Sequence, residues 1–153
     1  MKTKNYCFFI LFLVVQSIVS QAQMNLRGWF DAGQTWLVWE DTTPFPETYR
    51  IYKSPEQITD ISNADNTGRI FEMDGRGFRL KKLADTLNWT IPDGSGGLYT
   101  LKDNEALFVY TPHEAKPEYF AVLRDDNTII GSHNRVGPIE QTIEKVQCHL
   151  QVS

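Results

Sequence analysis

Short segments in which apolar and polar residues alternate recur along most of the chain. Residues 35–40 place Leu37 and Trp39 on one face and Trp36 and Val38 on the other, which is the two-residue period of a β-strand. The same criterion, with turn-forming residues as boundaries, predicts six more strands at 49–53, 69–73, 88–91, 107–110, 119–123 and 128–131. Many short strands with frequent turns predict an all-β fold, an antiparallel β-sandwich.

Two connections have more specific signals. Ser54 can cap a helix in which Pro55 occupies the first position, so one short helix is expected to end near Asn63. Residues 125–127, Asp-Asp-Asn, form a turn that predicts a hairpin between strands 119–123 and 128–131.

The start of the chain has the pattern of a secretory signal peptide. Lys2 and Lys4 precede an apolar stretch, Phe8 to Val15, which is shorter than the ~20 residues that span a bilayer. Small residues then lead to Ala22, after which we expect cleavage. We therefore predict a signal peptide at 1–22, a β-sandwich at 23–141 and a secreted or periplasmic product.

Residues 142–153 are predicted to be a tail or linker. A linker is expected over 138–144, and beyond it Val146, Cys148, Leu150 and Val152 alternate with polar residues as in an amphipathic strand. Such a strand either docks on its own sandwich or pairs with another chain.

Signal cleavage changes the charge and the cysteine content. The full chain has 15 basic and 19 acidic residues. Without Lys2 and Lys4 the balance is 13 − 19 = −6, which disfavours nucleic acid or an anionic membrane as partner. Cys7 leaves with the signal peptide, so Cys148 has no intramolecular disulfide partner.

Candidate catalytic and metal motifs are weak. The segment nearest to a Gly-x-Ser-x-Gly nucleophile motif, Asp93–Gly97, has Asp at its first position and is interpreted as a surface loop. The spacing of residues 63–74 partly matches a calcium loop, but a turn leading into a strand explains it better. Glu114 and Glu118 are interpreted as ordinary loop acids, and the histidines have no ligand spacing. We predict no enzyme activity, metal or cofactor.

Tryptophans are the best candidates for ligand binding. Trp36 lies on the face opposite Trp39, and neither Trp29 nor Trp89 has an obvious core position. Exposed tryptophans stack on sugars or anchor interfaces. The alternative is that additional elements of the fold cover them.

The strands containing Trp39, Tyr49–Ile51, Tyr119–Leu123 and Gly131–Ser132 resemble strands B, C, F and G of a fibronectin type III domain. The resemblance implies core positions for Trp39, Tyr49, Ile51 and Tyr119, and a long decorated connection between strands C and E. Residues 97–99, 106–112 and 118–122 are also similar to the N-terminal accessory region of secreted bacterial α/β-hydrolase-type esterases.

The sequence therefore predicts a non-catalytic exported module that is a spacer or docking domain, accessory to a secreted hydrolase domain or a partner protein. The alternative hypothesis is a stand-alone glycan- or protein-binding module that uses Trp36, Trp29 or Trp89.

Overall fold

A computed structural model describes residues 23–40, 48–70, 73–74, 77–78, 90–125 and 129–142. The predicted signal peptide and most of the predicted tail lie outside these residues. The described strands are β1 (Arg27–Asp31), β2 (Gln34–Glu40), β3 (Tyr49–Ser54), β4 (Asp65–Ile70), β5 (Met73–Asp74), β6 (Gly77–Phe78), β7 (Thr90–Pro92), β8 (Leu98–Thr100), β9 (Glu105–Tyr110), β10 (Glu118–Arg124) and β11 (Arg135–Ile139). In the described part of the chain, no helix has the length and apolar character needed to cross a membrane.

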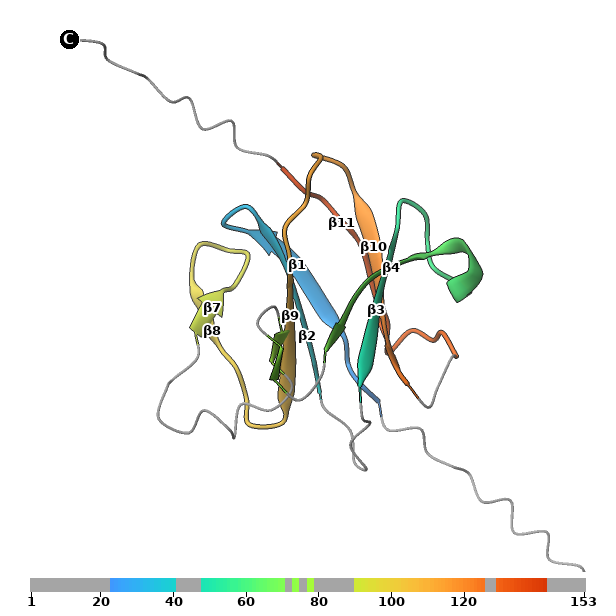
Figure 1. The fold of residues 1–153 in the computed structure, drawn as a ribbon. Coiled ribbons are helices and arrows are strands. Elements are labelled where there is room, and N and C mark those ends of the chain that lie inside the picture. Colours follow the sequence, from blue (N-terminus) through green and yellow to red (C-terminus); the bar gives the residue numbers. More distant parts are fainter. Residues whose placement is uncertain are drawn as a thin grey trace, which may run out of the picture.

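The strands form three antiparallel sheets. One sheet has the order β1-β2-β9-β6-β5, the second has the order β11-β10-β3-β4, and β7 pairs with β8 in a small separate ribbon. The two larger sheets pack face to face (Figure 1). The predicted all-β sandwich is confirmed.

The first strand was not predicted from the sequence. β1 pairs with β2 through a two-residue turn in which Ala32 and Gly33 both have positive φ, 51° and 75°. Two successive positive φ angles define a type I′ turn, whose twist matches that of the flanking strands. The turn at Ala32 and Gly33 therefore sets the register in which β1 pairs with β2.

The central core lies between the two large sheets. Trp39 is fully buried there and contacts Tyr49 edge to face, with ring centroids 5.2 Å apart. Ile51 is also fully buried in this core, so three of the four predicted core positions are confirmed. The fourth, Tyr119, is wrong: Phe120 enters the central core instead, and Tyr119 packs on the outer face of its sheet.

The outer face of each sheet has its own apolar cover. The ribbon β7–β8 covers β2 and β9, where Val38, Ile91, Leu101 and Leu107 form a second buried cluster. The segment after β3 covers β3 and β10, where Ile58 packs on Tyr52, Ala121 and Leu123. Figure 1 shows these covers on opposite sides of the sandwich. Both belong to the long connection that was predicted to decorate the fold.

The predicted helix after Ser54 is not formed. Ser54 Oγ does accept a hydrogen bond from the Glu56 N–H, at 3.1 Å, but the following residues remain irregular as far as a single 3₁₀ turn at Ile61–Asn63. Ile58 is 1% exposed and its carbonyl accepts a hydrogen bond from Arg135. Burial of Ile58 and use of its carbonyl by another strand outweigh the local helix signal.

The predicted hairpin partner 128–131 is also wrong, since residues 129–131 are not a strand. Asn134 is 1% exposed, accepts from the Gly131 N–H at 2.8 Å and donates to the Ile129 carbonyl at 2.9 Å. Its amide thus satisfies backbone groups that a strand ladder would use. β10 pairs instead with β11 on one edge, as far as Ile139 and Glu118, and with β3 on the other.

The predicted linker at 138–144 begins inside this last strand. Pro138 and Ile139 belong to β11, and both Ile139 and Gln141 are buried. The chain is therefore held against the sandwich through Gln141.

Candidate functional site

The tryptophans named as candidate ligand contacts are partly used inside the fold. Trp36 lies on the face opposite Trp39, as predicted, but is half-buried beneath the second cluster and donates its indole N–H to the Asp31 carbonyl at 3.0 Å. Trp29 is half-buried and donates to the Pro92 carbonyl at 2.7 Å. The added ribbon covers both rings in part, which favours the alternative interpretation. Trp89 lies outside the described residues.

The serine loop is a closed surface turn. Asp93 accepts hydrogen bonds from the Ser95 N–H, the Ser95 hydroxyl and the Gly97 N–H, at 2.8, 2.8 and 2.9 Å. These bonds, above all that from the Ser95 backbone, lower the pKa of Asp93. The Ser95 hydroxyl is thus a donor to a carboxylate in an exposed turn, as the surface-loop interpretation predicts.

The remaining motifs stay apart. The calcium-like spacing falls largely on β4, which is an extended strand and not a loop around an ion. Among the residues that the structure describes, no group of three or more His, Cys, Asp or Glu side chains is placed to hold a metal. His113 lies in the exposed loop between β9 and β10 and His133 lies in the loop before β11, while His149 and Cys148 are outside the described residues.

Two buried carboxylates were missed by sequence reasoning. The first is Glu105, which is fully buried at the start of β9. It accepts hydrogen bonds from Arg27, from the Tyr99 hydroxyl at 2.7 Å and from the Lys102 N–H at 2.8 Å. The Arg27 guanidinium also lies over the Tyr99 ring, 5.1 Å from its centroid.

The pKa values of Arg27 and Tyr99, the two side chains beside Glu105, are both raised. Burial lowers the pKa of Arg27, but hydrogen bonds and charges from Tyr99 and Glu105 outweigh it and leave the pKa raised. Burial raises the pKa of Tyr99. Three elements, β1, β8 and β9, are thereby tied together at one end of the sandwich.

The second buried carboxylate is Glu118, at the opposite end. It was expected to be an ordinary loop acid, yet it is 1% exposed. Its Oε1 lies 3.1 Å from Lys53 Nζ and 3.7 Å from Lys116 Nζ. Its Oε2 accepts from Gln141 Nε2 at 3.2 Å, and the same amide nitrogen lies 3.0 Å from Thr35 Oγ1.

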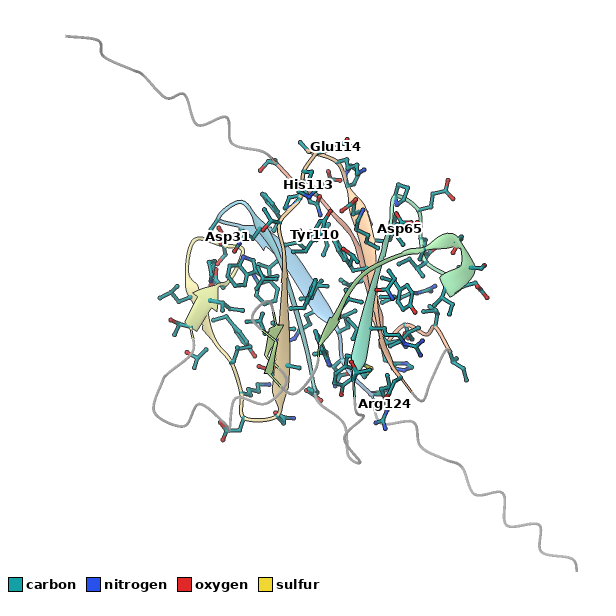
Figure 2. The ribbon with its side chains drawn as sticks, viewed as in Figure 1. Asp31, Asp65, Tyr110, His113, Glu114 and Arg124 are labelled. Carbon is teal, nitrogen blue, oxygen red and sulfur yellow. The ribbon has the colours of Figure 1, made fainter. Side chains whose placement is uncertain are left out.

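Two cavities open at this end of the sandwich, and Glu118 lines the smaller one. One has a volume of 180 Å³ and is lined by Lys53, Tyr110, His113, Glu114, Lys116, Glu118 and Gln141. The other has a volume of 460 Å³ and is lined by Gln34, Thr67, His113 and residues 108–111. Tyr110 and His113 line both, and we call the two cavities together the end cleft. Figure 2 shows Tyr110 between the two sheets, beneath His113 and Glu114, with Arg124 at the far end.

The charge of the end cleft is nearly balanced. Burial lowers the pKa of Lys53, but the hydrogen bond and charge of Glu118 outweigh it, so the pKa is raised and Lys53 stays protonated. Lys53 Nζ also lies 5.7 Å from the centroid of the Tyr110 ring. Lys116 shares Glu118 with Lys53 and lies 3.2 Å from Glu114. The arrangement can hold a small polar ligand by hydrogen bonds and one positive charge.

Comparison with known proteins found no matching family, and no curated protein or solved structure is significantly similar to the chain.

Proposed function

We propose that this protein is a non-catalytic, exported β-sandwich module that serves as a spacer or docking domain beside a hydrolase of ester or polysaccharide substrates. The observation that carries the proposal is the packing of the last described residues against the sandwich. Ile139 and Gln141 are 7% and 4% exposed, so the polypeptide is packed against the sandwich as far as Gln141.

The anchoring is polar as well as apolar. Gln141 donates to Thr35 on β2 and to Glu118 on β10, and these strands belong to different large sheets. A residue hydrogen-bonded to both sheets cannot reorient without breaking buried contacts, which cost about 1–3 kcal/mol each when left unsatisfied. The chain is therefore fixed on the sandwich as far as Gln141, which is what a spacer role requires of the described residues.

The path of the chain supports the same role. The Met24 carbonyl accepts a hydrogen bond from Glu40 N–H, and Glu40 pairs with Glu105 at one end of the sandwich. Ile139 pairs with Glu118 at the other end. The first and last described segments thus lie at opposite ends of the domain (Figure 1).

The strand arrangement supports the fibronectin type III-like relationship. In that relationship β2 and β9 correspond to strands B and E, β3 and β10 to strands C and F, and β11, not residues 131–132, to strand G. The covers on both outer faces are then additions within the connection between strands C and E. The relationship brings no catalytic residue with it.

The proposal is tested by assaying purified residues 23–153 with short-chain p-nitrophenyl esters and with a panel of polysaccharides. We expect release of product at the rate of the buffer control, and the same result for the matched variants Ser95→Ala and Glu118→Gln. Turnover that scales with protein concentration and is lost in either variant would overturn the proposal.

A further inference from the structure

One residue that lines the end cleft has an unused hydrogen-bond acceptor. Gln141 lines the smaller cavity and is 4% exposed, and its Oε1 is buried with no hydrogen-bond partner among the described residues. A buried polar atom without a partner is unfavourable. A bound hydroxyl or N–H group that reached this oxygen would remove that cost.

The same cavity contains a cation whose pairing is weak. Lys116 Nζ lies 3.2 Å from Glu114, whose side chain is 73% exposed, and 3.7 Å from Glu118. Exposed ion pairs contribute little and are given up readily. Glu118 is held closer by Lys53, at 3.1 Å. Lys116 is therefore available to a ligand that carries a single negative charge.

The rest of the lining is suited to a hydroxyl-rich ligand. Tyr110 contributes an aromatic ring to both cavities, and Gln34, Thr67 and Thr111 contribute amide and hydroxyl groups to the larger one. A volume of 460 Å³ lies within the range of about 300–1,000 Å³ found for small-molecule sites, in which aromatic surface is combined with a few placed polar groups.

From these three observations we propose that the end cleft binds a carboxylate-bearing saccharide, that is, a glycan that contains a uronic acid residue. Lys116 pairs with the carboxylate, Gln141 Oε1 accepts from a hydroxyl, and Tyr110 supports the sugar ring. The cleft lies at the end from which the chain leaves, so the glycan would be held beside anything attached there. This inference adds a ligand to the spacer or docking role proposed above. It rests on that role in one respect, that the protein binds the ligand without converting it.

The overall negative charge of the domain does not oppose this. At physiological ionic strength, charges separated by more than about 8 Å are largely screened. Lys116 and Lys53 are the cations nearest to the bound carboxylate. The nearest anions are Glu118, which Lys53 pairs, and Glu114, which lies 3.2 Å from Lys116 and which the ligand carboxylate replaces there. We therefore expect affinity that falls only modestly as salt is added, in contrast to a polyanion held by a broad basic surface.

The experiment is calorimetric titration of purified residues 23–153 with an oligomer of galacturonic acid, with its methyl-esterified form and with the neutral galactose oligomer. We expect saturable binding of the acidic oligomer only. Lys116→Gln should weaken it by about twofold to fivefold, the loss expected for an ion pair of a partly exposed lysine. Lys102→Gln is the matched control, because Lys102 is exposed next to Glu105 at the other end of β9.

The outcomes separate the two proposals. No saturable binding of the acidic oligomer, equal binding of all three oligomers, or equal loss in both lysine variants would overturn the cleft assignment and leave the spacer role intact. Binding of a peptide through its C-terminal carboxylate in place of the acidic oligomer would overturn it too. Binding of the acidic oligomer followed by its cleavage would support the site and overturn the non-catalytic function.

Discussion

The contact between the first and last strands allows one sharp test of the fold. Gly28 on β1 faces the central core, and a Cβ atom at this position would lie 2.7 Å from Cδ1 of Ile139 and 2.8 Å from Cδ2 of Leu37. Leu37 is fully buried and Ile139 is 7% exposed, so neither side chain can move aside without displacing its neighbours. Gly28→Ala should therefore overpack the core.

The size of the effect follows from two opposing terms. Overpacking a well-filled core costs about 1–3 kcal/mol, whereas replacing glycine by alanine stabilises by about 0.4–1 kcal/mol through the unfolded chain. We expect the free energy of unfolding to fall by about 1–2 kcal/mol. Urea denaturation followed by tryptophan fluorescence measures this difference.

The matched control is the double variant Gly28→Ala/Ile139→Val. The second change removes the Cδ1 atom that the new methyl group would contact, while on its own it should cost about 0.5–1.5 kcal/mol. If the contact exists, the double variant will be more stable than the sum of the single effects allows. Strict additivity, or a Gly28→Ala protein as stable as the parent, would refute the proposed approach of β1 to β11.

Three further predictions concern other parts of the domain. Asn134→Ala should lower the free energy of unfolding by about 1–3 kcal/mol, because backbone groups at 129–131 lose their partner, and unchanged urea denaturation would contradict this. Trp29→Phe should lose the hydrogen bond to the Pro92 carbonyl, worth about 0.5–1.5 kcal/mol. Amide hydrogen exchange should then become faster in β7–β8 than in β2, and equal protection of the amides in both would contradict the ribbon as a separate cover. Despite burial, which lowers it, the pKa of Lys53 is raised above its ordinary value of 10.5 by the pair with Glu118. This pair therefore stabilises the fold fully below pH 10.5, and the stabilisation is lost as the pH rises through the higher pKa of the folded protein. Urea midpoints measured across this range should therefore decline more steeply for the parent protein, and for the control Lys102→Met, than for Lys53→Met.

The sequence predicted those parts of the fold that depend on local pattern. Alternation around Leu37 and Trp39 identified β2 as a strand but not the face that enters the central core, because Val38 on the opposite face is also fully buried. The core position of Trp39 came from the fibronectin type III resemblance. β10 is likewise apolar on both faces: Phe120 and Val122 enter the central core and Ala121 and Leu123 the outer cluster. The core position of Tyr119 was implied by the resemblance, and a strand with two apolar faces gave no signal against it.

The end cleft could not be predicted from sequence, because its parts are far apart in the chain. Lys53 and Glu118 are separated by 65 positions, and Gln141 and Thr35 by 106. An acidic residue ahead of an apolar strand is an ordinary loop pattern. Only the pairing of β10 with β3 brings Glu118 beside its lysine and buries it.

The proposed role requires that the sandwich hold the chain rigidly through Gln141. Backbone ¹⁵N relaxation of purified residues 23–153 tests this directly at residues 139–142, with Phe120 in the fully buried core as internal reference. We expect order parameters near the rigid value of about 0.85 through Gln141, and a marked decrease in the variant Gln141→Ala. Values below about 0.6 at Ile139 and Gln141 in the parent protein would show a flexible tether and contradict the proposed role.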